Sequence, residues 1–382
     1  MSVLDLTPER IAEDTRYLLR DIPPDRTILL HSSLRAFLEP LSAREATRGR
    51  DGAGPGVVRS GPEADMAKVV VDGVVDGLGR DATLAVPTFT SWNSLTSHAY
   101  RAAVEGKTPE DRARIEAALP AFDPATTPSE EVGFLTEVIR RRGFRSRHPQ
   151  TSFAAIGKRG REIVDGHDPR SHLGEASPLG ALYRTPNTHI LMAGTDWDTC
   201  TAFHLAEYKR ENPQERHYQT RVYSPLNGRG EFTQYRDVVL DDSDFMGIGK
   251  AFMEHGAGLT KGGFIGGAKC LLVPFKPAVD FAVRYMEENR VPLAPEDLRK
   301  FTMQRDLVDG YTQTKEFSQE RQSFLLRPVG ARISSKQLGL TMTPASEALR
   351  TPRKDLSHRD RVTDQSPAYR AAVSRPREIS SE

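Results

Sequence analysis

A histidine and a glutamate stand three residues apart in the segment Thr199–Glu207, at positions 204 and 207. This segment follows the short apolar run Ile190–Gly194, which is typical of a buried strand, and it is predicted to form a helix. Residues i and i+3 of a helix lie on one face. An imidazole can accept a proton at neutral pH, and a nearby carboxylate stabilises the resulting imidazolium. The spacing predicts a general base, His204, supported by Glu207; the alternative is a polar pair on a solvated helix face.

Apolar runs typical of strands alternate with helical stripes along most of the chain. The expected strands are Thr27–His31, Thr83–Pro87, Ser152–Gly157, His189–Gly194 and an antiparallel one at Phe232–Val239. The expected helices are Thr7–Leu19, Met66–Leu78, Ser129–Ile139, Asp244–Glu254 and Pro277–Glu288. This alternation predicts an α/β layered domain. The glycine-rich run Gly262–Gly267 favours a surface turn, and residues 94–120 are left unassigned.

Two stretches depart from this alternation. Residues 39–64 are rich in Gly, Arg and Pro without an apolar period, so we predict a mobile loop or insertion there. Residues 1–325 are predicted to form the catalytic domain, and residues 326–382 a C-terminal extension. The extension is charged, with Pro and Ser, from Thr351 onward, and it is expected to be largely disordered from about residue 351.

Composition restricts the classes of function. The 382 residues are 37% hydrophobic, which is sufficient for a sizeable core. A net charge of +1 indicates neither a nucleic-acid binder nor a membrane-surface protein. The two cysteines, Cys200 and Cys270, form no disulfide framework and no CxxC zinc motif. No apolar run approaches the roughly 20 residues of a membrane span, and the N-terminus lacks the order of a signal peptide. We therefore expect a cytoplasmic protein.

Several familiar catalytic motifs are missing from the sequence. There is no P-loop, no GxGxxG that opens a helix after a strand, and no GxSxG nucleophile elbow. The spacings of His148, His167, His172 and His204 match no zinc motif, so we predict no metal; a metal-dependent hydrolase is the alternative. Ligands of α/β sheets bind beyond the carboxyl ends of the strands. Three loops lie next to predicted strands: Ser32–Leu34 and Thr88–Thr90 each follow one, and Arg145–Pro149 precedes the strand that starts at Ser152.

Ordered blocks of residues carry a resemblance to a known family. They are His31–Arg35; Gly79 with Thr83–Thr90; Phe122–Pro124 with Thr127–Ser129 and Gly133; Arg145, Ser146, His148 and Pro149 with Ser152–Ala155 and Gly157; Ser177–Leu179 with Leu182 and Tyr183; and Thr201 with His204–Glu207. In number, order and spacing, these blocks resemble the aminoglycoside 3-N-acetyltransferases, which differ in fold from the GNAT acetyltransferases. The resemblance covers roughly residues 8–285.

The resemblance implies a three-layer α/β/α fold with a central mixed sheet, and direct transfer of an acetyl group from acetyl-CoA to a primary amine. It implies that His204 is the base and Glu207 its support. The coenzyme-binding residues that it implies are His31, Ser32, Ser33, Leu34, Arg35, Thr88 and Ser152. Asp123 and His148 would contact the acceptor, and Arg145 or Arg147 would supply charge to the coenzyme phosphates. We expect a monomer or a homodimer that binds small molecules, and neither nucleic acid nor a membrane.

The acceptor stays open at this point. Aminoglycosides are polycations and favour acidic sites. This chain is nearly neutral, and its insertion carries several arginines. An amine of a natural-product or nucleotide-like intermediate, including an anionic one, is therefore an alternative acceptor for a biosynthetic enzyme. A coenzyme-binding partner protein without catalysis is the alternative from another class.

Overall fold

The computed structural model describes residues 6–38, 62–90, 92–129, 132–224, 229–255 and 259–294. All of them belong to the unit Met1–Ala331. Most of the predicted insertion at 39–64, namely residues 39–61, lies outside the described residues. The predicted extension 326–382 and its tail from 351 also lie outside them.

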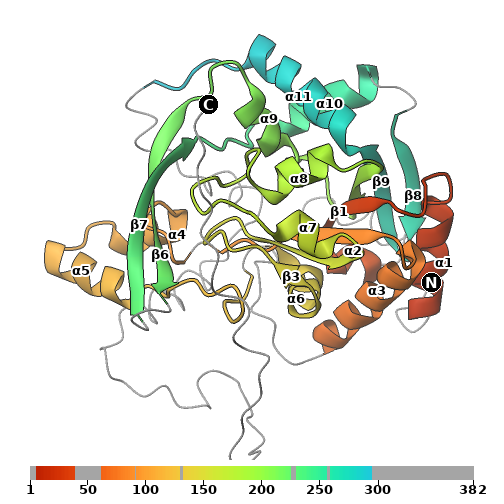
Figure 1. The fold of residues 1–382 in the computed structure, drawn as a ribbon, viewed down its shortest axis with the longest axis horizontal. Coiled ribbons are helices and arrows are strands. Elements are labelled where there is room, and N and C mark those ends of the chain that lie inside the picture. The colour runs from red at the N-terminus through yellow and green to blue at the C-terminus, as the bar shows by residue number, and fades with distance from the viewer. Residues whose placement is uncertain are drawn as a thin grey trace, which may run out of the picture. The chain divides into compact units, whose positions relative to one another are not determined.

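A seven-stranded sheet forms the centre of the described fold, in the order β3-β4-β2-β1-β5-β9-β8 (Figure 1). The central strands β2, β1 and β5 are parallel, and β4 and β9 join them antiparallel. The sheet is therefore mixed, as predicted. The bounds are β1 Thr27–Ser32, β2 Thr83–Pro87, β3 Phe144–Arg145, β4 Phe153–Gly157, β5 Thr188–Ala193, β8 Lys261–Ile265 and β9 Ala268–Pro274.

Alternate residues of the central strands face two separate hydrophobic cores. Ile28 and Leu30 of β1 lie in one core, while Leu29 between them lies in the other. This is the period-two pattern of a strand covered on both faces. The helices of the first core are α1 Pro8–Leu18, α2 Leu34–Leu38, α3 Pro62–Leu78 and α6 Gly133–Arg142. Those of the second are α7 Gly160–Val164, α8 Pro178–Arg184, α9 Phe203–Lys209, α10 Phe245–His255 and α11 Phe275–Asn289. The three-layer α/β/α prediction is confirmed.

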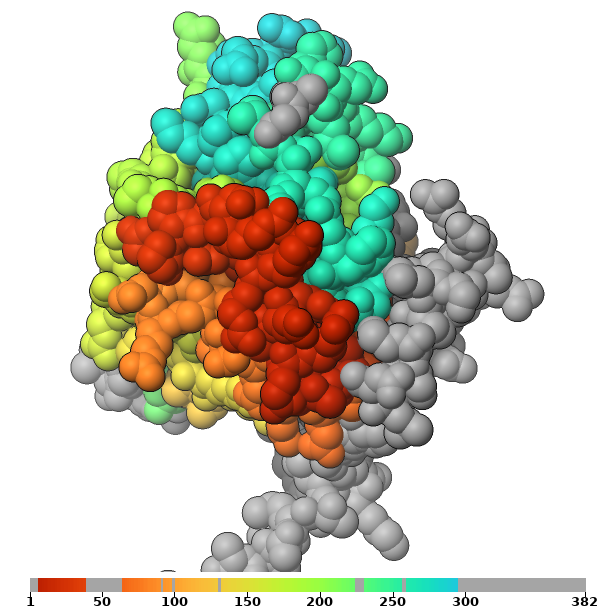
Figure 2. Space-filling view, turned by 90° about the vertical axis from the view of Figure 1, so that its right-hand side faces the viewer, coloured from red at the N-terminus to blue at the C-terminus, as the bar shows by residue number. Residues whose placement is uncertain are grey.

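Figure 2 shows the face of the molecule formed by the N-terminal residues, where α1 packs against α3 and β8. In the described part of the chain, no helix has both the length and the apolar character needed to cross a bilayer.

A second, two-stranded sheet stands beside the central one. It is the hairpin of β6 Glu215–Ser224 and β7 Arg229–Val238, seen at the left of Figure 1. The segment after β2 runs along the free edge of β6, where Leu95 N donates to Gln219 O at 2.9 Å. The antiparallel strand predicted at Phe232–Val239 is confirmed as β7. Residues 94–120, which sequence patterns left unassigned, contain α4 His98–Val104 and α5 Pro109–Ala118.

Two predicted elements need correction. The run Gly262–Gly267 is mostly strand rather than surface turn: β8 is an edge strand, and Gly266 and Gly267 make the turn into β9, with Gly266 at φ 55°. Glycine suits the strand because a Cβ at Gly263 would lie 2.7 Å from the Leu18 side chain of α1. The helix predicted from Ser129 begins instead at Gly133. The Ser129 amide and hydroxyl donate to the carboxylate of Glu137, so Ser129 is bonded to a side chain of this helix and does not cap its first turn.

Candidate active site

His204 and Glu207 both lie on α9 and contact each other. His204 Nδ1 lies 2.8 Å from Glu207 Oε2. The two residues are only 4% and 2% exposed, so the alternative of a solvated polar pair is wrong. A carboxylate only accepts hydrogen bonds, and the network therefore assigns the proton of His204 to Nδ1 and leaves Nε2 as the acceptor. This is the arrangement that a general base requires.

A second set of donors holds the other oxygen of Glu207. Oε1 accepts from the amide of Asp241 at 2.8 Å and from Arg290 Nη1 at 2.6 Å. Arg290 also donates to both carboxylate oxygens of Asp244, at 2.5 and 2.7 Å. Burial by itself lowers the pKa of Arg290, but its bonds to Asp244 and the charge of Glu207 raise that pKa above its ordinary value. Arg290 is therefore a permanent cation that orients Glu207.

Sequence patterns gave no signal for Arg290. It lies 83 residues from Glu207, just after the end of α11, where a lone arginine is indistinguishable from a solvated one. Only the packing of α11 beside α9 brings the two together.

His31 lies at the end of β1, close to His204. Its side chain is buried, and Nε2 has no hydrogen-bond partner. Burial, and then the charge of His204, lower the pKa of His31 to about 3. His31 is consequently neutral at physiological pH. A buried polar atom without a partner is costly, so Nε2 is a group that a bound ligand would satisfy.

The predicted coenzyme-binding turn continues from His31 into α2. Ser32, Ser33 and Leu34 are half-buried, and Arg35 is exposed. The amide of Ser33 donates to Ala193 O at 3.0 Å, which ties the end of β1 to the end of β5. The turn therefore lies at the carboxyl edge of the parallel strands, and its role in binding stays a prediction.

Thr88 and Ser152 are joined at the neighbouring strand ends. Their hydroxyl oxygens lie 2.9 Å apart, and both residues are fully buried. Arg145 donates to Ser152 Oγ at 3.0 Å and to Thr88 O at 3.0 Å. Its other amino group donates to the carbonyl of Thr127. Arg145 therefore binds the protein's own loops. The coenzyme contacts predicted for Thr88 and Ser152 stay predictions.

Asp123 forms a local turn. Its Oδ1 accepts from the amide of Ala125 at 2.9 Å, and its Oδ2 accepts from the hydroxyl of Thr126 at 2.9 Å. An Asx turn of this kind explains an aspartate before proline without any ligand. The predicted contact between Asp123 and the acceptor stays a prediction.

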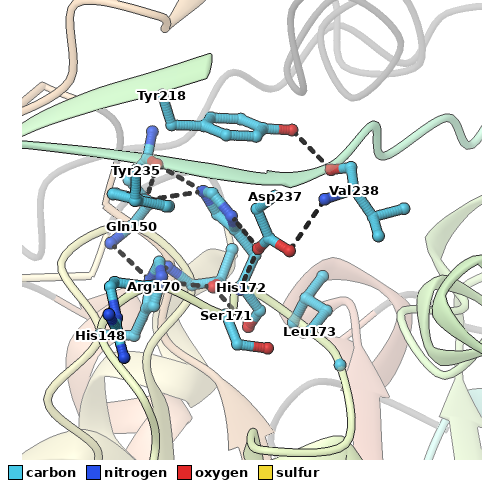
Figure 3. A network of polar contacts seen from close by, with 12 residues as sticks. His148, Gln150, Arg170, Ser171, His172, Leu173, Tyr218, Tyr235, Asp237 and Val238 are labelled. Atoms are coloured by element: carbon cyan, nitrogen blue, oxygen red, sulfur yellow. Dashed lines mark hydrogen bonds and ion pairs between the residues drawn. The ribbon is translucent and has the colours of Figure 1, made fainter. Parts of the chain in front are cut away.

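His148 is buried in a cluster of histidines (Figure 3). Its Nδ1 accepts from the amides of Gln150 and Thr151, at 3.2 and 3.1 Å, while its Nε2 has no partner. Its ring stacks on His167 with centroids 4.8 Å apart. Burial, followed by the charges of His172 and His167, lowers the pKa of His148 well below its usual value. The predicted acceptor contact at His148 stays a prediction.

His172 connects this cluster to the β6–β7 hairpin. Its Nδ1 lies 2.7 Å from Asp237 Oδ2, and its Nε2 lies 2.6 Å from Gln150 Oε1 (Figure 3). Tyr235 OH lies 3.0 Å from His172 Nε2, and Tyr208 OH donates to Asp237 at 2.6 Å. Sequence patterns missed these hairpin residues because a single aspartate or tyrosine in a strand carries no motif. In the described residues, no group of three or more His, Cys, Asp or Glu side chains is arranged to hold a metal ion.

Known proteins share this architecture. YokD of Bacillus subtilis, an aminoglycoside N(3')-acetyltransferase-like protein, is 28% identical over 288 residues, covering 74% of this chain and 93% of that protein. Its crystal structure superposes with a TM-score of 0.59, covering 74% of this chain and 99% of that one. Aminoglycoside N(3)-acetyltransferase VIII of Streptomyces fradiae is 28% identical over 249 residues, covering 61% of this chain and 82% of that protein. The structure of AAC-IIIb in binary complex with CoASH, 21% identical, has the same fold, with a TM-score of 0.56 over 76% of this chain and 99% of that one.

The family described as aminoglycoside 3-N-acetyltransferase matches residues 57–287, more than half of the chain. The resemblance carried by the sequence blocks is confirmed: the chain belongs to the aminoglycoside 3-N-acetyltransferase family, a family of acyltransferase enzymes.

Proposed function

We propose that this protein transfers the acetyl group of acetyl-CoA directly to a primary amine, with His204 as the general base. The observation that carries the proposal is the buried contact between His204 and Glu207, beside the neutral His31 at the carboxyl edge of the sheet. Membership of the family and the CoASH complex of AAC-IIIb support the choice of donor. His31, Ser32, Ser33 and Leu34 are the residues proposed to hold the coenzyme.

The proposed chemistry follows from the protonation states. A primary amine is protonated at neutral pH and cannot attack a thioester until it loses a proton. The ammonium loses a first proton to solvent. Glu207 keeps the proton of His204 on Nδ1, so Nε2 accepts a second proton, from the neutral amine, as its nitrogen attacks the acetyl carbonyl. The tetrahedral intermediate then collapses, the carbon–sulfur bond breaks, and the proton leaves with the thiol of coenzyme A. Glu207 stabilises the imidazolium in between.

The acceptor proposed first is an aminoglycoside or a related amine-bearing small molecule. The AAC-VIa structure bound to sisomicin supports it, as does the name of the Streptomyces fradiae relative. The second candidate is an anionic amine, which would make the protein a biosynthetic N-acyltransferase. An arginine buried without a counter-charge, described below, favours this second candidate.

Replacement of His204 tests the proposal. In the full chain, His204→Ala should reduce amine-dependent thiol release from acetyl-CoA by about 10²–10⁴-fold, because proton removal is lost. Circular dichroism verifies that the variant is folded. His217→Ala is the matched control, since His217 is an exposed histidine on β6 and should leave turnover unchanged. Undiminished turnover in folded His204→Ala would remove His204 from its role. Acetyl-CoA binding without thiol release from any amine would instead favour a non-catalytic partner protein.

A further inference from the structure

The β6–β7 hairpin carries a buried arginine that forms no ion pair with any described residue. Arg216 on β6 is 9% exposed, and its Nε and Nη1 are buried without a hydrogen-bond partner. In the described residues, no carboxylate forms an ion pair with it. Burying a cation without a counter-anion is strongly unfavourable, and arginine is the residue best suited to bind carboxylate or phosphate in such a place.

The groups around Arg216 do not neutralise it. Its guanidinium lies over the ring of Tyr218, 5.1 Å from the centroid. Asp237 is its cross-strand partner on β7, but the oxygens of that carboxylate are already bonded to His172, Tyr208 and the amide of Val238. A second cation, Arg101 of α4, lies close enough for its charge to lower the pKa of Arg216, after the larger effect of burial. Among the residues that the structure describes, Arg216 therefore has no carboxylate left to pair with.

Arg216 and the candidate base His204 both influence His172. The Tyr218 ring under its guanidinium lies 4.2 Å from the ring of His172. Burial lowers the pKa of His172, and the charges of Arg216 and His204 lower it further against the opposing effect of Asp237. The charge of His204 also lowers the pKa of His31, after the larger effect of burial. The charge of His204 therefore acts both on His31, where the predicted coenzyme turn starts, and on His172, which contacts the hairpin.

We propose that Arg216 binds an anionic group, a carboxylate or phosphate, of the acceptor whose amine is acetylated at His204. This inference rests on the proposed function and narrows its acceptor to anionic amines. The acceptor is favoured over the coenzyme as the source of the anion because Arg216 lies on the β6–β7 hairpin, whereas the predicted coenzyme turn at Ser32–Leu34 belongs to the end of β1 in the central sheet. Arg216 donates to the anion through a guanidinium N–H that now has no partner.

Matched acceptors and matched variants test this site in the full-length protein. Glucosamine 6-phosphate and glucosamine offer the same amine with and without an anion. Arg216→Gln should raise KM for the phosphorylated amine by about 10–100-fold and leave KM for glucosamine and acetyl-CoA within about twofold. Arg216→Lys, which keeps the charge, should recover part of the loss. Arg236→Gln is the control, because Arg236 on β7 is exposed and paired with Glu215 at 3.1 Å; it should change neither KM.

A binding measurement gives a readout that does not depend on turnover. Inorganic phosphate should raise the Tm of the wild type and of Arg236→Gln, but not that of Arg216→Gln. Without phosphate, Arg216→Gln should melt no lower than the wild type, because it removes an unpaired buried charge. Equal phosphate shifts in the wild type and Arg216→Gln would overturn the site. So would an Arg216→Gln effect confined to KM for acetyl-CoA, which would assign the anion to the coenzyme.

The two proposals fail separately. If thiol release is faster with the uncharged amine and is unaffected by Arg216→Gln, the proposed acetyl transfer is supported and the proposed anion site is overturned. Absence of thiol release with every amine, together with phosphate binding that requires Arg216, would reject the proposed reaction and support the site.

Discussion

At the scale of single residues, the candidate base depends on a chain of charged contacts. His204 contacts one oxygen of Glu207, and Arg290 binds the other. Arg290 is in turn bonded to Asp244. Each of these side chains is hydrogen-bonded to the next, and these bonds keep the buried carboxylate of Glu207 in one orientation. Glu207 therefore offers Oε2 to the imidazole rather than turning toward the arginine with both oxygens.

Replacement of Arg290 should distinguish an effect on the orientation of Glu207 from an effect on the binding of acetyl-CoA. Arg290→Met leaves Glu207 and Asp244 without their cation, so we expect a loss of about 3–5 kcal/mol in the free energy of unfolding. In the folded fraction, kcat should fall while KM for acetyl-CoA holds, because only the orientation of Glu207 changes. Urea unfolding and steady-state kinetics measure both.

The control for this change is Arg184→Met, which breaks the exposed pair of Arg184 with Glu175. It should cost no more than about 1 kcal/mol. An unchanged kcat in Arg290→Met would show that Glu207 keeps its orientation without the arginine.

At the scale of elements, α9 is fixed by the packing of the segment before it. Trp197, in the short helix Trp197–Thr199, is buried and stacks on Phe203 at the start of α9, with centroids 5.6 Å apart. On its other side, α10 approaches Trp197 closely at Gly249. A Cβ at Gly249 would lie 2.0 Å from Cγ of the indole. The glycine is therefore what allows α10 and α9 to enclose the tryptophan.

Gly249→Ala should displace Trp197 and, with it, the start of α9. We expect a loss of about 1–3 kcal/mol in the free energy of unfolding, together with a fall in turnover. Gly262→Ala is the control, because nothing lies within 4 Å of a Cβ there, and it should stay within about 0.5 kcal/mol. Thermal unfolding of both variants measures the difference; equal Tm values would show that the indole shifts at no cost.

At the scale of the molecule, the fold buries several neutral histidines. His148, His167 and His172 form one cluster, and His31 lies at the end of β1. Burial lowers the pKa of His167 to about 4 and that of His31 to about 3. An unfolded chain protonates these side chains near pH 6.5. Below that pH the unfolded state binds protons at these histidines and the folded state does not, so the free energy of unfolding decreases.

Stability should therefore decrease steadily as the pH falls from about 6.5 to about 4, and above about pH 5 few carboxylates contribute to the slope. His167 alone should account for a loss on the order of 3 kcal/mol by pH 4, since one pKa unit corresponds to about 1.4 kcal/mol. Urea midpoints at pH 7.5, 6 and 5 measure this slope. His167→Gln should flatten it, whatever the variant's stability at pH 7.5. An identical slope in the variant would contradict the assignment to buried histidines.

Local patterns were sufficient for much of the fold. The apolar runs at Thr27–Ser32 and Thr83–Pro87 are strands because a strand buried on both faces must be apolar throughout. The pattern failed at β8, whose two glycines break the apolar run; of these, Gly263 lies against Leu18 of α1. It also failed at α4 and α5, whose mixed charged composition shows no clear apolar stripe.

The sequence by itself determined the strands β1, β2, β4, β5 and β7, the family, and the shared helix face of His204 and Glu207, because periodicity and i,i+3 spacing act within one element. Only the tertiary structure decided that this pair is buried, that Arg290 holds it, and that Arg216 lies unpaired near His172. Those facts depend on segments dozens of residues apart meeting in the fold. Burial and charge at each position follow from that meeting rather than from any local pattern.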